Sequence, residues 1–408
     1  MSKFKSDFMN EMDVRGFLNQ STDFEALDRH FATGARTAYL GCDPTADSLH
    51  VGHLIPVMMM RWLQRFGHRP ILLVGGATGY IGDPDKDTER PLLTPEKIAA
   101  NSRGLKRSYE KFLEFKGKGA AAMVDNYDWF RDMGYLKFLR EVGTMVSVNK
   151  LVTLDRIKKR LDAELHLSFL ELNYPLLQSY DFLVLYEKFG CDVQICGADQ
   201  WGNAIGGVDL IRRKKNADAF VLSAPLLLAA NGRKMGKSEG NAAWVNDDRA
   251  SAYDYYQFFR NADDRDVGKM LRFFTDLPMK EVERLEKLSG SEINGAKKVL
   301  AFEATKICRG YDDAKSAEAT ARDTFEKRGA GADLPVFQYE PGMGVIDAFV
   351  TAGLAKSKGE ARRLLAGGGL YVNEHKIADE KFRIAPEMFR DGVVILSAGK
   401  KNKAVLRR

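Results

Sequence analysis

The sequence predicts an α/β protein in which a doubly wound parallel sheet is followed by a helical domain and a small α+β module. From Arg36 to about Ala230, apolar strand-like runs alternate with helical stretches, a pattern typical of a parallel sheet covered by helices. The strand pattern then stops, and a helical stretch and a compact basic unit follow. The chain has 408 residues, which is enough for two or three domains.

The strands expected in the first region are short and separated by polar segments. They span residues 37–41, 70–74, 120–124, 193–196 and 220–228, and a helix is expected at 54–66. Pro56 falls in the first turn of that helix, where a missing N–H is tolerated. Ligands of such sheets bind at the carboxyl ends of the strands. Glycine-rich and polar strings directly follow these strands, so we expect the functional residues there.

The rest of the chain divides into a helical part and a terminal module. Pro278 can open a helix in the helical part. In the module, Ser357 and Glu360 form a capping box at a helix start, glycines at 367–369 end that helix, and a short hairpin is expected at 370–377. The predicted divisions are residues 1–245 (catalytic), 246–328 (helical), 329–342 (linker rich in glycine and proline) and 343–408 (module).

The net charge of +6 is unevenly distributed. The 66 residues from Met343 to the end contain 13 Lys/Arg and 7 Asp/Glu, whereas the preceding 342 residues carry equal numbers of each sign. A small basic unit attached to a neutral body indicates contact with a polyanion such as nucleic acid. The alternative interpretation is a solvated tail with a few spare lysines.

Several protein classes are excluded by composition. No run of 18 apolar residues predicts a transmembrane helix, and the N-terminus lacks the apolar core of a signal peptide. The cysteines are too few and too scattered for a disulfide framework or a zinc site, so we expect reduced thiols, no protein metal site and a cytoplasmic location. The run Lys158-Lys159-Arg160 is interpreted as surface charge.

A first motif, His50-Val51-Gly52-His53, ends the string from Tyr39 to His53, which runs from an expected strand into an expected helix. Two imidazoles three residues apart at a helix start point the same way as the free backbone N–H groups there, which suits an anionic ligand. Gly52 lets a ligand approach the backbone closely. An ordinary loop with two capping histidines is the alternative.

A second motif, Lys234-Met235-Gly236-Lys237-Ser238, lies more than 180 residues later. Glycines beside two lysines make a cationic loop that can close over a triphosphate and stabilise charge that grows in the transition state. A solvated surface turn is the alternative for this string alone. Together and in this order, the two motifs indicate a device for attack on the α-phosphate of ATP, with pyrophosphate leaving.

These motifs and four longer strings resemble the class I aminoacyl-tRNA synthetases, specifically the bacterial-type tyrosyl-tRNA synthetases. The strings run from Asp43 to His50, from Gly75 to Pro84, from Tyr174 to Asp181 and from Gly197 to Asn203. The similarity extends over nearly the whole chain. It implies a Rossmann-like catalytic domain and a C-terminal module similar to a ribosomal protein's RNA-binding unit.

The resemblance implies a tyrosine pocket. Tyr39 and Asp181 resemble the pair that binds the phenol hydroxyl. Three further residues, Asp83, Tyr174 and Gln178, resemble the group that receives the ammonium. Gln200 is expected to line the tyrosine and α-phosphate region. Because buried polar groups are costly to leave unpaired, such a pocket should reject phenylalanine for its missing hydroxyl.

The resemblance also implies nucleotide and tRNA contacts. The residues implied in catalysis, as binders of the leaving pyrophosphate, are Thr45, His50, His53, Lys234 and Lys237. Those implied in ATP binding are Gly41, Asp43, Gly52, Gly197, Asp199, Lys237 and Ser238. The tRNA contacts are expected at Arg212, Arg213, Arg362 and Arg363, although a solvated helix end is an equal alternative for the first two. Leu40 and Cys42 depart from the family pattern near the ribose.

The expected activity is ligation of L-tyrosine to tRNA(Tyr) through a tyrosyl-adenylate, with ATP as substrate, Mg²⁺ entering with it, and a homodimeric assembly. Two alternatives remain from the sequence. The chain could be a catalytically inactive synthetase-like RNA-binding or splicing accessory protein, or a class I synthetase for another aromatic amino acid.

Overall fold

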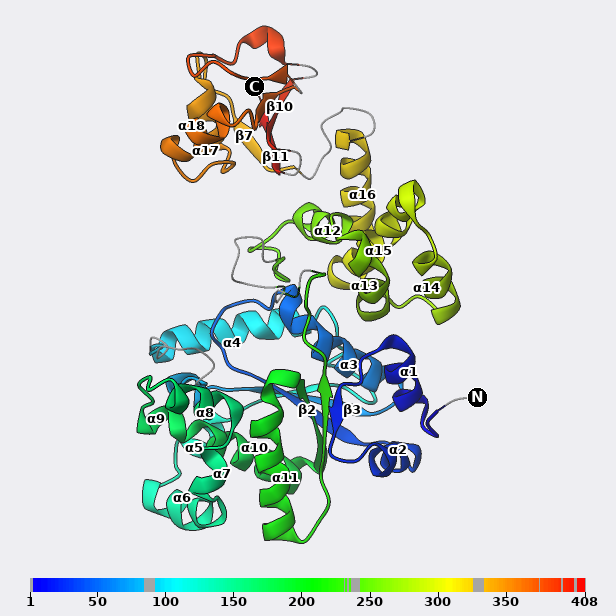
Figure 1. The fold of residues 1–408 in the computed structure, drawn as a ribbon, viewed down its shortest axis with the longest axis vertical. Coiled ribbons are helices and arrows are strands. Elements are labelled where there is room, and N and C mark those ends of the chain that lie inside the picture. The colour runs from blue at the N-terminus through cyan, green and yellow to red at the C-terminus, as the bar shows by residue number, and fades with distance from the viewer. Residues whose placement is uncertain are drawn as a thin grey trace. The chain divides into compact units, whose positions relative to one another are not determined.

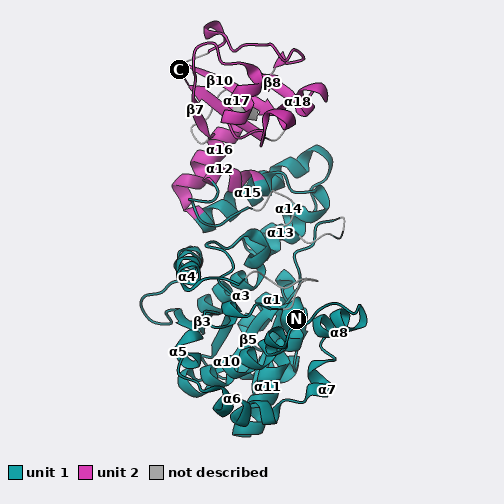
Figure 2. Cartoon of the chain, turned by 90° about the vertical axis from the view of Figure 1, so that its left-hand side faces the viewer, with its two compact units in different colours: residues 1–250, 258–308 teal, residues 251–257, 309–408 magenta. Residues whose placement is uncertain are grey.

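The computed structural model describes residues 3–83, 92–230, 232, 235, 243–325, 334–373, 375–389, 392–399 and 402–407. The chain forms two compact units, and each is described by itself. The first comprises Met1–Ala250 and Phe258–Cys308, and the second comprises Ser251–Gln257 and Arg309–Arg408 (Figure 2). Much of the stretch expected as a separate helical domain therefore belongs to the first unit. The boundaries at residues 245 and 328 stay a prediction.

The first unit is built on a six-stranded sheet with the order β1-β6-β5-β2-β3-β4 (Figure 1). Its strands are β1 (Gln20–Ser21), β2 (Thr37–Cys42), β3 (Arg69–Val74), β4 (Ala122–Asp125), β5 (Cys191–Gly197) and β6 (Phe220–Ala224). All neighbours pair in parallel except β1, which is antiparallel to β6. After β2 the chain builds the sheet first toward β4 and then, on the other side, toward β6. This confirms the doubly wound sheet and places its switch point between β2 and β5.

The observed strands follow the expected ones with small shifts. The edge strand β4 starts at Ala122 rather than at residue 120. The last parallel strand ends at Ala224 rather than at residue 228. Pro225 follows it directly, and proline cannot donate to the strand ladder.

Three helices hold the sheet and the residues at its carboxyl edge. The helix α3 (Leu54–Arg65) packs against β2, β3, β5 and β6. The helices α10 (Tyr174–Phe189) and α11 (Trp201–Lys215) pack on each other and on β5. The ring of Phe182 on α10 lies 5.1 Å from the ring of Tyr39 on β2, between centroids. The inner face of α10 thereby fixes the strand that ends at the site.

The other helices up to residue 325 are mostly short. They are α1 (Asp7–Arg15), α2 (Phe24–Ala32), α4 (Pro95–Tyr109), α5 (Tyr127–Phe130), α6 (Tyr135–Glu141), α7 (Val148–Leu151), α8 (Asp155–Asp162), α9 (Phe169–Leu172), α12 (Ala252–Arg260), α13 (Val267–Phe274), α14 (Met279–Glu286), α15 (Ile293–Arg309) and α16 (Tyr311–Phe325).

A buried arginine at the end of α1 joins the region after α13 to α3. The guanidinium of Arg15 donates hydrogen bonds to the carbonyl oxygens of Arg272, Thr275 and Leu277 and stacks on the ring of Trp62. Fully buried arginines need such partners because an unpaired buried charge is very costly. These bonds explain why the structure groups residues 258–308 with the first unit.

The second unit contains a five-stranded sheet with the order β7-β11-β10-β8-β9. Its elements are β7 (Val336–Gln338), α17 (Val345–Thr351), α18 (Lys358–Ala366), β8 (Leu370–Val372), β9 (His375–Lys376), β10 (Val393–Ala398) and β11 (Asn402–Arg407). Ser357 caps α18 and β8 pairs with β9, as expected for the helix start and the hairpin. The stretch 329–342, expected to be a linker, contains β7, which pairs in parallel with β11. The module's sheet therefore begins before residue 343.

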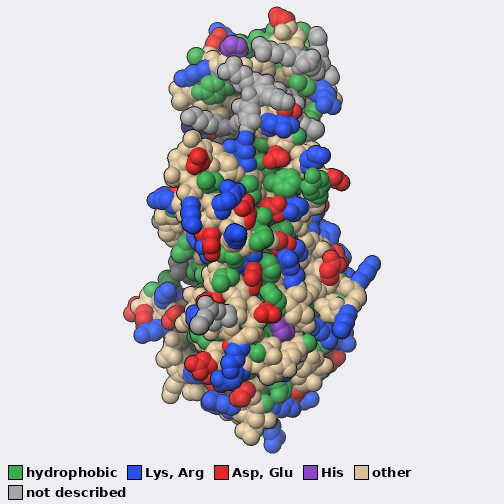
Figure 3. All heavy atoms as spheres, turned by 90° about the vertical axis from the view of Figure 1, so that its right-hand side faces the viewer, with side chains coloured by type: hydrophobic (Ala, Val, Ile, Leu, Met, Phe, Trp, Pro, Cys, Tyr) green, Lys and Arg blue, Asp and Glu red, His purple; other side chains and the backbone are tan. Residues whose placement is uncertain are grey.

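Charge is mixed over the face drawn in Figure 3, where basic and acidic side chains lie interspersed among the atoms that are described. This agrees with the equal numbers of both signs in the first 342 residues. Among the residues that the structure describes, no helix is long and apolar enough to cross a membrane.

Candidate functional site

A cavity of about 710 Å³ opens at the carboxyl ends of β2 and β5, the switch point of the sheet. It brings together predicted residues from all four strings and from the first motif: Tyr39, Gly41, Asp43, Thr45, His50, Gly52, His53, Asp83, Tyr174, Gln178, Asp181, Gly197, Asp199 and Gln200. Leu40 and Cys42 also line it. Stretches separated by more than 150 residues in the sequence thus form one site.

One end of the cavity can bind a hydroxyl group. The Tyr39 hydroxyl is buried and finds no hydrogen-bond partner among the described residues. Asp181, from α10, lies near enough for its charge to act on this tyrosine. Its two carboxylate oxygens accept hydrogen bonds from Asn126 (Nδ2, 3.1 Å) and Trp129 (Nε1, 2.9 Å). The sequence did not single out Asn126 or Trp129, although Asn126 directly follows a strand, which is a usable signal.

Burial controls the ionisation of Asp181. Removal from water raises its pKa to about 8, although the bonds from Asn126 and Trp129 work in the opposite direction. Burial also raises the pKa of Tyr39 well above its usual range, and the neighbouring Asp181 adds to that rise. Both side chains are buried, and a buried group with an unmatched hydrogen bond has a large cost.

Replacing Asp181 with asparagine should make the free energy of unfolding less dependent on pH. The folded pKa of about 8 exceeds the ordinary 3.8, so the folded protein binds more protons between these values. Stability from this group is thus greatest at low pH and is lost as the pH rises through that window. Urea unfolding of wild type and variant at about pH 5 and about pH 8 measures the slope. Equal slopes in the two proteins would contradict the raised pKa.

Acceptor oxygens gather beside the phenol end. The Tyr174 hydroxyl donates to Asp43 Oδ2 at 2.9 Å, and Thr78 Oγ1 donates to Asp43 Oδ1 at 2.7 Å. Gln178 Oε1 and Asp83 Oδ1 are buried without a hydrogen-bond partner among the described residues. With the Tyr174 oxygen they make three acceptors, the number that an ammonium group requires. Asp43, expected at ATP, has both carboxylate oxygens engaged by protein groups.

Arg156 links two predicted substrate residues and was not anticipated. Its guanidinium donates to Asp83 Oδ2 through Nη1 and to Asp199 Oδ2 through Nη2, the latter at 2.9 Å. Gln200 Nε2 also donates to Asp83 Oδ2, at 2.8 Å. Arg156 lies on α8 in a run of mixed charge that gives no sequence signal.

The neighbouring run of charge was interpreted wrongly at one position. Arg160 is buried and forms an ion pair with Glu171 at 2.6 Å, whereas Lys158 and Lys159 are exposed as expected. The ion pair with Glu171, eleven residues later in the chain, compensates the burial of this charged side chain.

The phosphate end is formed by the two histidines. Nδ1 of His50 accepts the Gly52 backbone N–H at 3.1 Å, and Nδ1 of His53 accepts the His50 backbone N–H at 3.4 Å. The rings stack with centroids 3.8 Å apart. Because Nδ1 is the acceptor in both neutral rings, Nε2 carries the proton and is a donor. The capping alternative and the ligand-binding interpretation are therefore compatible.

The backbone around the second motif returns to these histidines. Val51 N–H donates to the Ala243 carbonyl at 3.0 Å, and Val245 N–H donates to the Leu49 carbonyl at 2.9 Å. Met235 lines the cavity, and a Cβ added to Gly52 would lie 2.8 Å from the Met235 carbonyl oxygen. Gly52 is thus required by the close approach of protein backbone, a different reason from the expected approach of a ligand.

Three predicted residues of that motif, Lys234, Lys237 and Ser238, lie outside the described residues. Their described neighbour Met235 lines the cavity. The segment beginning at Ala243 forms backbone hydrogen bonds with Leu49 and Val51, on either side of His50.

The predicted tRNA residues lie outside the cavity lining. Arg212 and Arg213 are in the last turn of α11, where Arg212 donates to Asp209 at 3.2 Å and Arg213 to the Met145 carbonyl at 2.7 Å. The helix has 15 residues, so this end is about 22 Å from its start beside Gln200. In the second unit, Arg362 on α18 forms an ion pair with Glu380 at 2.6 Å. Arg363 is exposed on the same helix.

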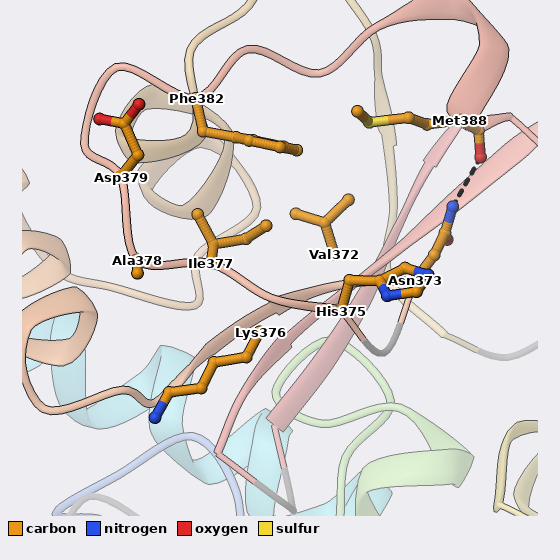
Figure 4. A pocket seen from close by; sticks show the side chains of 9 residues that line it. All are labelled: Val372, Asn373, His375, Lys376, Ile377, Ala378, Asp379, Phe382 and Met388. Atoms are coloured by element: carbon orange, nitrogen blue, oxygen red, sulfur yellow. Dashed lines mark hydrogen bonds between the residues drawn. The ribbon is translucent and has the colours of Figure 1, made fainter.

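The second unit has its own cavity, of about 420 Å³ (Figure 4). Apolar side chains and a few polar ones line it: Val372, Asn373, His375, Lys376, Ile377, Ala378, Asp379, Phe382 and Met388. The Asn373 side chain closes one side by donating to the Met388 carbonyl at 2.6 Å. None of the residues expected to bind tRNA lines it.

Comparisons with known proteins identify the family of the chain. Residues 32–326 match the family described as tRNA synthetases class I (W and Y), and residues 326–406 match a tyrosine–tRNA ligase C-terminal domain. The chain is 48% identical to the tyrosine–tRNA ligase of Novosphingobium aromaticivorans over 411 residues and to that of Rhodopseudomonas palustris over 416 residues, with each chain fully covered.

Solved structures show the same fold. A C-terminally truncated mitochondrial tyrosyl-tRNA synthetase of Aspergillus nidulans aligns with a TM-score of 0.70 at 27% identity, covering 79% of this chain and 95% of that one. A tyrosyl-tRNA synthetase of Archaeoglobus fulgidus, solved with L-tyrosine, aligns with a TM-score of 0.57 at 17% identity, covering 76% and 100%. At that identity the likeness concerns the fold alone.

Proposed function

Because this chain belongs to the class I tRNA synthetases for tryptophan and tyrosine and ligates tyrosine to tRNA, we propose which of its residues perform each step. The observation that carries the proposal is a set of buried oxygens without partners among the described residues. The Tyr39 hydroxyl, Gln178 Oε1 and Asp83 Oδ1 belong to side chains that line one cavity. A ligand with a phenol and an ammonium would satisfy them.

Tyrosine recognition is assigned to the two polar ends of this pocket. Tyr39 and Asp181 bind the phenol hydroxyl, and Asn126 and Trp129 hold the Asp181 carboxylate in position. The ammonium binds the acceptor oxygens of Tyr174, Gln178 and Asp83, next to Gln200. A substrate without a hydroxyl leaves a buried acceptor unpaired, which favours tyrosine over phenylalanine.

An exchange assay with three amino acids tests this assignment. Asp181→Asn should lower kcat/KM for tyrosine-dependent ATP–pyrophosphate exchange by about 10- to 100-fold, since a buried hydrogen-bonding group left without its partner costs about 1–3 kcal/mol. Exchange with phenylalanine should change little, and tryptophan should remain inactive. Tyr180→Phe, the neighbouring residue outside the cavity lining, is the matched control and should leave all three rates unchanged. Equal losses with tyrosine and phenylalanine would contradict recognition of the hydroxyl.

Activation requires binding and charge stabilisation more than acid–base chemistry. The tyrosine carboxylate is already a nucleophile and attacks the α-phosphate of ATP, which expels pyrophosphate and leaves tyrosyl-adenylate. Thr45, His50 and His53 donate hydrogen bonds to the departing phosphates, and Lys234 and Lys237 join them. Gly41, Asp43, Gly197, Asp199 and Ser238 form the nucleotide site. The tRNA ribose hydroxyl then attacks the tyrosyl carbonyl carbon of the adenylate, so that the ester bond to tRNA forms, the bond to the phosphate breaks and AMP leaves.

Magnesium accompanies ATP in this proposal. Within the described ranges, no group of three or more His, Cys, Asp or Glu side chains could hold a metal ion. We propose an ion that is held mainly by phosphate oxygens, as is usual for Mg²⁺. When bound, the ion would neutralise phosphate charge.

Assembly and tRNA contact extend the proposal. We infer a homodimer, because large apolar side chains are exposed in the region between α5 and α10: Tyr127, Tyr135, Leu136, Val148, Leu161, Leu165, Phe169 and Leu170. Leu136 and Phe169 are 79% and 65% exposed, which is unusual for a surface without a partner.

The tRNA contacts are assigned to four arginines: Arg212, Arg213, Arg362 and Arg363. The enzyme works in the cytoplasm, where its substrates meet.

The two alternatives are disfavoured by specific observations. An inactive accessory protein has no need for the buried acceptors and the histidine donors that this cavity retains. An indole N–H only donates, so it would leave the buried Tyr39 hydroxyl proton without an acceptor, whereas a phenol hydroxyl both donates and accepts.

A further inference from the structure

Arg156 occupies two carboxylates at once. Its guanidinium reaches Asp83 through Nη1 and Asp199 through Nη2, and its side chain is 21% exposed. Asp83 is 6% exposed and Asp199 37% exposed, so the bridge extends from the buried part of the cavity toward its mouth. A planar guanidinium with several donors is well suited to hold two acceptors in this way.

The same two carboxylates are those assigned to the substrates, and the inference rests on that proposed function. Asp83 receives the ammonium of tyrosine, and Asp199 belongs to the nucleotide site, where we assign it to the ribose hydroxyls of ATP. The ammonium and the guanidinium would be two cations on one buried carboxylate, where little water screens their repulsion. Ribose hydroxyls at Asp199 compete with Nη2 for the same acceptor oxygen.

The position of Arg156 makes release feasible. It is the second residue of α8, at the end of the helix, and its long side chain is partly exposed. A flexible side chain of this kind can rotate toward water without unfolding the helix. The buried pair formed by Arg160 and Glu171 keeps α8 attached when the Arg156 contacts break.

We propose that Arg156 is a positioning residue that couples the binding of tyrosine to the binding of ATP. It acts as an internal counter-ion for Asp83 and Asp199 while the cavity is empty. Whichever substrate binds first must displace it, and the second then binds without that cost. Tyrosine and ATP therefore bind with positive coupling, and the coupling is reciprocal.

Calorimetry with a non-reacting nucleotide tests the coupling. In wild type, saturating α,β-methylene-ATP should lower the Kd of L-tyrosine by about 10-fold, within the usual range of coupling. In Arg156→Gln, tyrosine alone should bind about 10-fold more tightly than in wild type, and the nucleotide should add little. Lys159→Gln removes an exposed charge from the same helix and should behave as wild type.

Two further measurements separate this inference from the ammonium assignment. The ligand 3-(4-hydroxyphenyl)propionate lacks the ammonium, so Arg156→Gln should not tighten its binding. Asp83→Asn should weaken tyrosine but not this analogue. If Asp83→Asn leaves tyrosine binding unchanged, the ammonium site itself is wrong. If Asp83→Asn weakens tyrosine while Arg156→Gln binds it equally or more weakly than wild type, Arg156 supports Asp83 and the coupling role is overturned.

Discussion

Replacing His50 with alanine should slow tyrosyl-adenylate formation by about 100- to 1,000-fold while leaving the affinity for tyrosine almost unchanged. His50 belongs to the phosphate end of the cavity, and the tyrosine acceptors belong to other elements. Its Nδ1 accepts a backbone N–H, so the proton is on Nε2, and in our proposal this N–H donates to phosphate. Such a donor matters most when pyrophosphate develops charge, and its loss therefore affects the rate more than substrate binding.

Rapid-quench measurement of adenylate formation, together with calorimetric titration of tyrosine, tests this prediction. His30→Ala is the matched control, because His30 is paired with Asp192 at 2.8 Å and does not line the cavity. His50 also caps the short helix that starts at Val51, so thermal unfolding of each variant must be compared. If His50→Ala weakens tyrosine binding as much as it slows the reaction, the histidine does not act on the leaving group.

The location of the site could be predicted from the sequence because its physical cause is local. Polar and glycine-rich strings directly follow apolar strands, and parallel strands bring their carboxyl ends to one edge. Asp43, His50 and Asp199 therefore reach the same cavity although Asp199 lies about 150 positions further along the chain. Gly75 shows how tight this edge is, since a Cβ there would lie 2.1 Å from Asp43 Oδ1.

The supporting contacts could not be predicted in the same way. Trp129 donates to Asp181, 52 residues later in the chain, and Arg156 donates to Asp199, 43 residues later. No rule of sequence spacing connects such pairs. Arg160 was interpreted as exposed because its neighbours are charged, and its burial depends on Glu171 from another helix. The strand β7 was missed because it has three residues and is mostly exposed, so that it lacks an apolar pattern.

Removing residues 334–408 should leave tyrosine-dependent ATP–pyrophosphate exchange intact and reduce kcat/KM for tRNA charging by at least about 100-fold. The removed segment contains 13 Lys/Arg and 8 Asp/Glu, a net charge of +5, and its neutralisation of tRNA phosphates releases counterions. The cut falls before β7, because β7 pairs with β11 and a cut at residue 342 would leave a strand without its partner.

The core of this module is formed by its own residues, which makes the truncation a fair test of its role. The apolar cluster extends from Val345 to Leu406, with Phe337 and Tyr339 packed against it. Within the intact chain, Arg363→Gln should weaken charging modestly and reduce the slope of log kcat/KM against log salt by about 1, if Arg363 contacts one phosphate. Ala361 is buried on the same helix, so Ala361→Gly, which alters α18 without removing charge, is the control for helix stability. A truncated enzyme that charges tRNA at the wild-type rate would show that the basic module has no part in the reaction. Its excess positive charge would then not bind tRNA during charging.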